Sequence, residues 1–179
     1  MKNFLLYIFA LAFFISCGHR SEHYKISGTT RGFQDETILY LDNIFDQAMI
    51  DSAEIIAGRF SFTGQLAEPT RIMLRTNEYS DNLIFWAENS EITITAQKGD
   101  FRNAKITGAK IEDRVTKFEE KIQPLLRDLS GLQDCKIRAA DSLQREQLQK
   151  EKNSIQTLLD TRYMDYIYSH PDDIYSGYL

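Results

Sequence analysis

The stretch that decides the fold is residues 49–63, MIDSAEIIAGRFSFT. It contains two runs of strand-forming residues, Met49–Ile56 and Arg59–Thr63, on either side of Ala57-Gly58. In the second run two phenylalanines alternate with polar residues, which is the period of a strand with one buried face. Glycine tolerates the positive φ that a tight turn requires. The stretch therefore predicts a β-hairpin that turns at Ala57-Gly58.

Short strand-like runs continue on both sides of this hairpin. Each is bounded by Gly, Asn, Asp or Pro, and no helical period lies between them, which excludes a parallel βαβ arrangement. We therefore expect residues 24–108 to form an antiparallel β-sandwich or a partly closed barrel of seven or eight strands. The further runs are Tyr24–Ser27, Thr37–Leu41, Arg71–Arg75, Leu83–Trp86, Glu91–Thr95 and Phe101–Thr107.

The period changes after Gly108. Apolar residues then recur at spacings of four and three, which places them on one stripe of a helix. We expect residues 109–170 to form a hairpin of two amphipathic helices, with a kink or break at Pro124 and a turn near Ser130-Gly131. The stripe of the first helix consists of Ile111, Val115, Phe118, Ile122, Leu125 and Leu129.

The second helix, expected over about 134–169, is polar in its middle. Residues 144–154 contain a single apolar side chain, and an i,i+4 pair such as Glu146–Lys150 would support this solvated part. The apolar stripes fit either a monomeric hairpin packed on the sandwich or a coiled-coil dimer. Residues 171–179 are typical of a linker-like tail.

The N-terminal residues 1–16 are similar to a signal peptide. Lys2 supplies a positive charge, and the apolar run that follows is too short to span a bilayer. Phe14-Ile15-Ser16-Cys17 resembles the lipobox of bacterial lipoproteins, with Phe14 in place of the usual leucine. This implies lipidation of Cys17 and a tether over residues 17–23. We expect a lipid-anchored protein of the cell envelope that faces the periplasm, with a plain secreted form as the alternative.

Charge and cysteine content exclude several classes of function. The chain has a net charge of −5, which becomes −6 once Lys2 leaves with the leader. That balance argues against nucleic acid, and against anionic lipid as an electrostatic partner. With Cys17 acylated, Cys135 is the remaining thiol, so the chain has neither an internal disulfide nor a CxxC pair.

No arrangement typical of catalysis is present in the sequence. A GxSxG elbow, an HExxH motif and a Gly-rich phosphate loop are all missing. Asp42, Asp46 and Asp51 are spaced like turn and capping residues rather than like an acid–base pair. The histidines are too scattered for a metal cluster. We therefore expect no catalytic residue, no metal and no cofactor.

The aromatic residues fall into two groups. Those in the predicted strands, Trp86 among them, are expected to fill the sandwich core. The second group consists of tyrosines near the C-terminus, whose apolar rings and polar hydroxyls are common at contact surfaces. We hypothesise that residues 163–179 dock against another domain or chain through Tyr163, Tyr166, Tyr175 and Tyr178.

Three separated segments carry a resemblance to a known family. They are YKISGTTRG at 24–32, DSAEIIAGRFSFTGQLAEP at 51–69, and ENSEITIT at 88–95 followed by ITGAK at 106–110. In this order they resemble an uncharacterised domain, a domain of unknown function, of Bacteroidota lipoproteins. The resemblance covers roughly Tyr24 to Tyr168. In that family the domain typically precedes a thioredoxin-like domain of the AhpC/TSA or TlpA type.

The chain ends in SHPDDIYSGYL, residues 169–179, which resembles the family's stretch that leads toward the thioredoxin-like domain. We expect that domain to be absent, since no CxxC pair occurs. The leading hypothesis is a non-catalytic, lipid-anchored interaction module, accessory to thioredoxin-like thiol–disulfide systems. One alternative is the truncated N-terminal part of a TlpA-like oxidoreductase. Another is a periplasmic lipoprotein that binds a small ligand in the sandwich.

Overall fold

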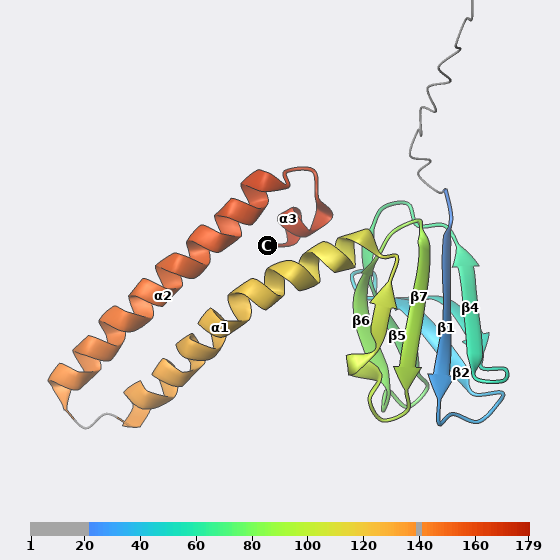
Figure 1. Cartoon of the computed structure of the whole chain (residues 1–179), viewed down its shortest axis with the longest axis horizontal. Helices are drawn as coiled ribbons and strands as arrows, with labels where there is room; N and C mark the ends of the chain where they lie inside the picture. Colours follow the sequence, from blue (N-terminus) through green and yellow to red (C-terminus); the bar gives the residue numbers. More distant parts are fainter. Residues whose placement is uncertain (1–21, 139–140) are drawn as a thin grey trace, which may run out of the picture.

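The computed structural model describes residues 22–138 and 141–179, which form two four-stranded sheets and a pair of long helices (Figure 1). The sandwich with a C-terminal helical pair confirms the predicted fold class, and the sheets do not close into a barrel. The predicted leader, Cys17 and most of the tether over residues 17–23 lie outside the described residues.

Sheet A has the strand order β4-β1-β7-β8. Its strands are β1 (Tyr24–Arg31), β4 (Arg59–Gly64), β7 (Glu91–Gln97) and the short β8 (Lys105–Thr107). β1 and β7 pair in parallel, whereas the sequence predicted antiparallel sheets throughout. A parallel pair needs a long crossover. Here the strands of sheet B supply it, and period-2 alternation does not encode the direction of a partner strand.

Sheet B has the order β3-β2-β5-β6, and all its pairs are antiparallel. Its strands are β2 (Ile38–Asn43), β3 (Ala48–Glu54), β5 (Thr70–Thr76) and β6 (Asn82–Ala87). The inward side chains of both sheets interdigitate to form the core. Among the fully buried ones are Ile26, Leu41, Phe62, Leu74, Phe85 and Ile94.

The hairpin of residues 49–63 has the predicted turn, but its strands separate into different sheets. Ala57 and Gly58 have φ values of 50° and 71°, as a two-residue hairpin turn with both central residues at positive φ requires. Ile56 and Arg59 exchange two backbone hydrogen bonds of 2.9 and 3.0 Å. Beyond this bridge β3 pairs with β2, while β4 pairs with β1. The turn thus connects the two layers of the sandwich along one edge.

Gly28, in the middle of β1, allows close packing within sheet A. A Cβ at this position would lie 2.4 Å from both the carbonyl oxygen of Ile94 and Cζ of Phe60. Phe60 occupies the space that a side chain would need, so the strand continues through Gly28 instead of ending there as the sequence suggested.

The boundary between the two helices lies later in the chain than predicted, so α1 is longer and α2 is shorter than expected. α1 (Lys110–Arg138) continues through Pro124 and past Ser130-Gly131, and α2 (Ser142–Ser169) begins after Asp141. A proline inside a helix removes one hydrogen bond at a cost of about 3 kcal/mol. Packing of the apolar stripe against α2 offsets this cost, as Ile122, two residues before the proline, is buried. The break comes instead at Asp141, whose side chain accepts a hydrogen bond from the backbone N–H of Leu143.

Two smaller elements complete the fold. A 3-10 turn, η1 (Phe101–Asn103), buries Phe101 before β8 begins, where a single strand was expected. The C-terminal residues form a short helix, α3 (Ile174–Tyr178), where a linker-like tail was predicted. In the described part of the chain, no helix combines the length and apolar character needed to cross a bilayer.

Two glycine substitutions test this packing. We expect Gly28→Ala to lower the free energy of unfolding by about 1–3 kcal/mol, because the new methyl group overpacks the core. Gly131→Ala is the matched control, since nothing lies within 4 Å of its added Cβ. It should raise stability by up to about 1 kcal/mol through helix propensity. Urea denaturation measures both, and a G28A variant as stable as the parent would contradict the close packing at β1.

Candidate interaction surface

The sandwich and the helices meet at Trp86. This side chain points outward from β6, yet only 2% of it is exposed. It shares a hydrophobic cluster with Ile111 and Val115 of α1, and Tyr175 of α3 stacks edge-on against it with ring centroids 5.9 Å apart. We call Trp86, Phe118, Tyr166 and Tyr175 the aromatic junction, since each ring contacts at least one other in the set.

Asp173 holds α3 in the aromatic junction. Its carboxylate caps the helix by accepting from the backbone N–H of Tyr175, at 3.2 Å. It also forms an ion pair with Arg114 of α1, with an N–O distance of 2.7 Å, and accepts from the hydroxyl of Tyr166 at 3.2 Å. Burial, followed by the charge of Asp173, raises the pKa of Tyr166. One carboxylate therefore joins α1, α2 and α3.

Two further carboxylates fasten α1 to the sandwich. Glu88 accepts from the backbone N–H groups of Lys110 and Ile111, at 2.7 and 3.2 Å, and so caps the helix from outside it. Glu112 accepts from the backbone N–H of Trp86 at 2.9 Å. Burial raises the pKa of Glu112, and the hydrogen bond from Trp86 lowers it by less. These contacts are structural, since the carboxylates are satisfied by backbone groups.

The four tyrosines of the predicted docking surface do not form one surface. Tyr166 and Tyr175 are buried in the aromatic junction, and Tyr163 packs half-buried on Phe118. Tyr178 is 51% exposed, and its hydroxyl accepts a hydrogen bond of 2.9 Å from Arg71 of β5. The segment therefore packs on α1 and the sandwich of its own chain, and docking on a second chain stays a prediction.

The outer face of sheet B carries an apolar row that the sequence analysis did not single out. Outward residues of the four strands align in register as Met49, Asp42, Met73 and Ile84. Met49 is 61% exposed and Ile84 is 43% exposed, although such side chains are usually inside. The signal was present in Arg71–Arg75 and Leu83–Trp86, which have apolar residues at consecutive positions, because every second residue of a strand faces outward.

The next row is built around Arg75 of β5. Its guanidinium forms an ion pair with Asp42 and lies over the rings of Tyr40 and Tyr79, 4.8 and 4.1 Å from their centroids. Asp42 is thus a partner of this arginine on a strand, and not the turn residue expected from the sequence. With Phe45, which is 51% exposed, the two rows form a surface that we call the apolar face (Phe45, Met49, Met73, Tyr79 and Ile84, with Tyr40 and Arg75).

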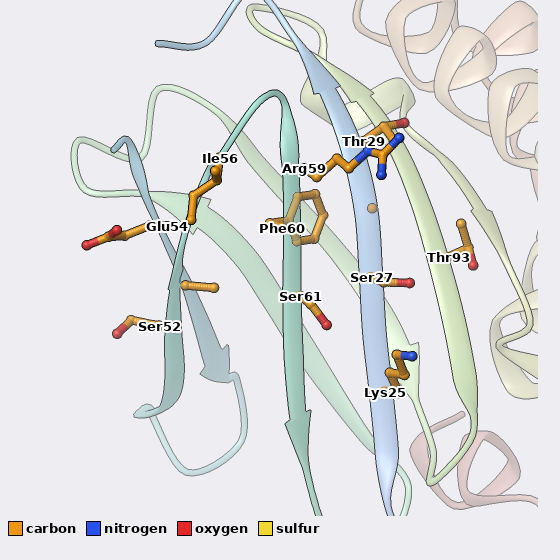
Figure 2. A pocket seen from close by; sticks show the side chains of 12 residues that line it. Lys25, Ser27, Thr29, Ser52, Glu54, Ile56, Arg59, Phe60, Ser61 and Thr93 are labelled. Atoms are coloured by element: carbon orange, nitrogen blue, oxygen red, sulfur yellow. The ribbon is translucent and has the colours of Figure 1, made fainter. Parts of the chain in front are cut away.

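The outer face of sheet A is chemically different. Its central rows consist of hydroxyl side chains: Ser61, Ser27, Thr93 and Thr107 are register partners across the four strands, and Thr29 and Thr95 are adjacent in the next row. An open groove passes from this face to the β3 edge, where Ser52 and Glu54 line it (Figure 2). We call this surface the hydroxyl face. It resembles an ordinary solvated sheet face, unlike the apolar face.

The predicted chemical sites are distributed as follows. Cys135 is an exposed thiol on α1. His170 stacks on Tyr166 with ring centroids 4.5 Å apart. Within residues 22–138 and 141–179, no group of three or more His, Cys, Asp or Glu side chains is placed to hold a metal ion. Cys17, the predicted lipidation site, lies outside the described residues.

Comparison with known families gives a match over residues 24–115 to the Domain of unknown function (DUF4369). These residues contain all the strands of both sheets and the first turns of α1, as far as Val115 in the hydrophobic cluster with Trp86. A comparison with curated proteins gave no match. The matched region includes both the apolar face, apart from any contribution of α3, and the hydroxyl face.

The role of Asp173 can be tested with a neighbouring control. Asp173→Ala removes the cap of α3 and its contacts to Arg114 and Tyr166, and should lower the free energy of unfolding by about 2 kcal/mol. Trp86 is the single tryptophan of the chain, so release of α3 should also shift its fluorescence to longer wavelength. Asp172→Ala, at the adjacent exposed residue, should change neither quantity. Equal behaviour of the two variants would contradict the clamp.

Glu112 should make stability depend on pH. Its pKa is raised above the ordinary 4.5, so the folded state favours the protonated form. The resulting stability is present below pH 4.5 and is lost as pH rises through the raised pKa. Glu112→Gln should therefore gain stability relative to the parent as pH rises from about 4 to 7. Urea denaturation across that range measures the difference. The exposed Glu120→Gln is the control, and parallel profiles for parent and E112Q would refute the assignment.

Proposed function

We propose that this chain, which belongs to the DUF4369 family of domains of unknown function, acts as a non-catalytic interaction module of the cell envelope. Lipid on Cys17 holds it at the membrane on the periplasmic side, and a protein partner docks on the apolar face. The partner is a thioredoxin-like domain or a substrate of one. The observation that carries this proposal is the uncovered apolar face of sheet B.

The composition of the apolar face supports a protein partner. Met, Tyr and Arg are enriched in the cores of protein interfaces, and contiguous exposed apolar patches mark such interfaces. Met49 and Met73 are flexible side chains that adapt to the shape of a partner. The outward side chains of sheet A are mostly Ser, Thr and charged residues, so the difference between the two sheets favours docking through sheet B.

The arginine row supports the same role through its rigidity. Arg75 is fixed by Asp42 and by the rings of Tyr40 and Tyr79, so its conformation is set before a partner arrives. Docking then loses little side-chain entropy at this position, which improves affinity for a given contact area. Aromatic and arginine side chains are also the residues that most often dominate binding energy at interfaces.

Site-specific photo-crosslinking in the native envelope tests this role. A photoreactive side chain at Ile84 or Met49 should yield a discrete adduct whose partner, identified by mass spectrometry, contains a thioredoxin fold. Ser61 on the hydroxyl face is the matched control and should give no such adduct. Adducts of equal yield at Ser61 and Ile84, or none at either residue on the apolar face, would reject the apolar face as the docking site.

Anchoring and catalysis are tested separately. Cys17→Ser should move the protein out of the membrane fraction, since the acyl chains supply the membrane affinity. The parent protein should not accelerate the reduction of insulin by dithiothreitol. Unchanged membrane association of C17S would refute the anchor, and insulin reduction by the purified chain would refute the non-catalytic role.

A further inference from the structure

The hydroxyl face has an excess of positive charge, although the chain as a whole has a net charge of −5. Its outward residues include four cations, Lys25, Arg31, Arg59 and Lys105, against one carboxylate, Glu91. Within the part of the chain that the structure describes, none of the four cations forms an ion pair. Their charge is therefore available to a ligand outside the chain.

Two of the cations, Lys25 and Arg59, line the open groove of this face. Arg59 and Lys105 are at the two ends of one row across the sheet, and the residues between them are Thr29 and Thr95. At the usual strand spacing this row spans about 14 Å. Figure 2 shows Arg59 beside Thr29, the short side chains of Ser27, Ser61 and Thr93, and Lys25 on the same side of the sheet. The groove is open and does not enclose a ligand, and small ligands bind in concave sites that bury most of their surface, so this face fits an extended anionic surface better.

The position of the lipid anchor indicates which anionic surface the hydroxyl face would meet. Residues 17–23 connect Cys17 directly to β1, which lies inside sheet A between β4 and β7. Fully extended, this tether spans at most about 25 Å, so the hydroxyl face is within reach of the headgroups. The face has no aromatic side chain on which a sugar ring could stack, which disfavours a polysaccharide as the occupant.

We infer that the hydroxyl face lies on anionic lipid headgroups of the membrane that holds the anchor. This inference rests on the lipid anchor of the proposed function. It places sheet A against the membrane and turns the apolar face of sheet B toward a partner. The negative net charge of the whole chain disfavours contact with anionic lipid. The cations of sheet A, however, are gathered on one face, so the charge of that face differs from the net charge of the chain.

The test measures accessibility in the full lipidated chain. In a Cys135→Ser background, Ser61→Cys reports on the hydroxyl face and Met49→Cys reports on the apolar face; both residues are exposed. The proteins are reconstituted in phosphatidylcholine vesicles with or without phosphatidylglycerol, and labelled with a membrane-impermeant maleimide. We expect phosphatidylglycerol to slow labelling at S61C by roughly fivefold or more, the factor expected for one cation near an anionic surface. Labelling at M49C should stay unchanged.

Charge variants complete the test. Arg59→Gln with Lys105→Gln should restore fast labelling at S61C, whereas Lys117→Gln with Lys121→Gln, which removes two exposed cations of α1, should not. Equal labelling of S61C in both vesicle types would overturn the inference while leaving the anchor intact. Protection of S61C by soluble polygalacturonate, but not by phosphatidylglycerol, would also overturn it. Failure of the chain to stay on any vesicle would instead refute the anchor.

Discussion

The burial of Trp86 is the contact on which the arrangement of the molecule depends. An outward-facing tryptophan on an edge strand would normally be wet, but here the first turns of α1 and the ring of Tyr175 cover it. Its backbone N–H is satisfied by Glu112, so the helix is joined to the strand by both packing and hydrogen bonding. This contact fixes where the helices leave the sandwich. It covers one end of the outer face of sheet B and leaves the row from Met49 to Ile84 open.

Most of the fold follows from short-range pattern. Alternation and turn residues located the strands of both sheets because each strand has one buried face. The pattern could not show that β1 and β7 run in parallel, or that β3 and β4 leave their common turn for different sheets, because these depend on which edges meet in three dimensions. Pro124 and Gly131 are helix breakers by intrinsic preference, and tertiary packing of α1 on α2 overrode that preference.

The candidate surfaces were harder to predict, for a related reason. The tyrosines near the C-terminus have interface composition, and composition does not distinguish a contact with another chain from a contact within the same chain. Asp173 shows that the contact lies within the chain, because its carboxylate binds Arg114 of α1 and Tyr166 of α2. The apolar face and the cationic hydroxyl face need strand order and register, because their residues come from separate strands. The two faces differ in chemistry and lie on different sheets of the sandwich.

The central claim is that α3 belongs to the core of its own chain, which leaves the apolar face of sheet B as the open surface. Amide hydrogen exchange of the purified protein, without any partner, tests it most directly. The account predicts slow exchange over Ile174–Tyr178, comparable to that in the first turns of α1, because both cover Trp86. Exchange at Ile174–Tyr178 as fast as in an unstructured peptide would contradict it.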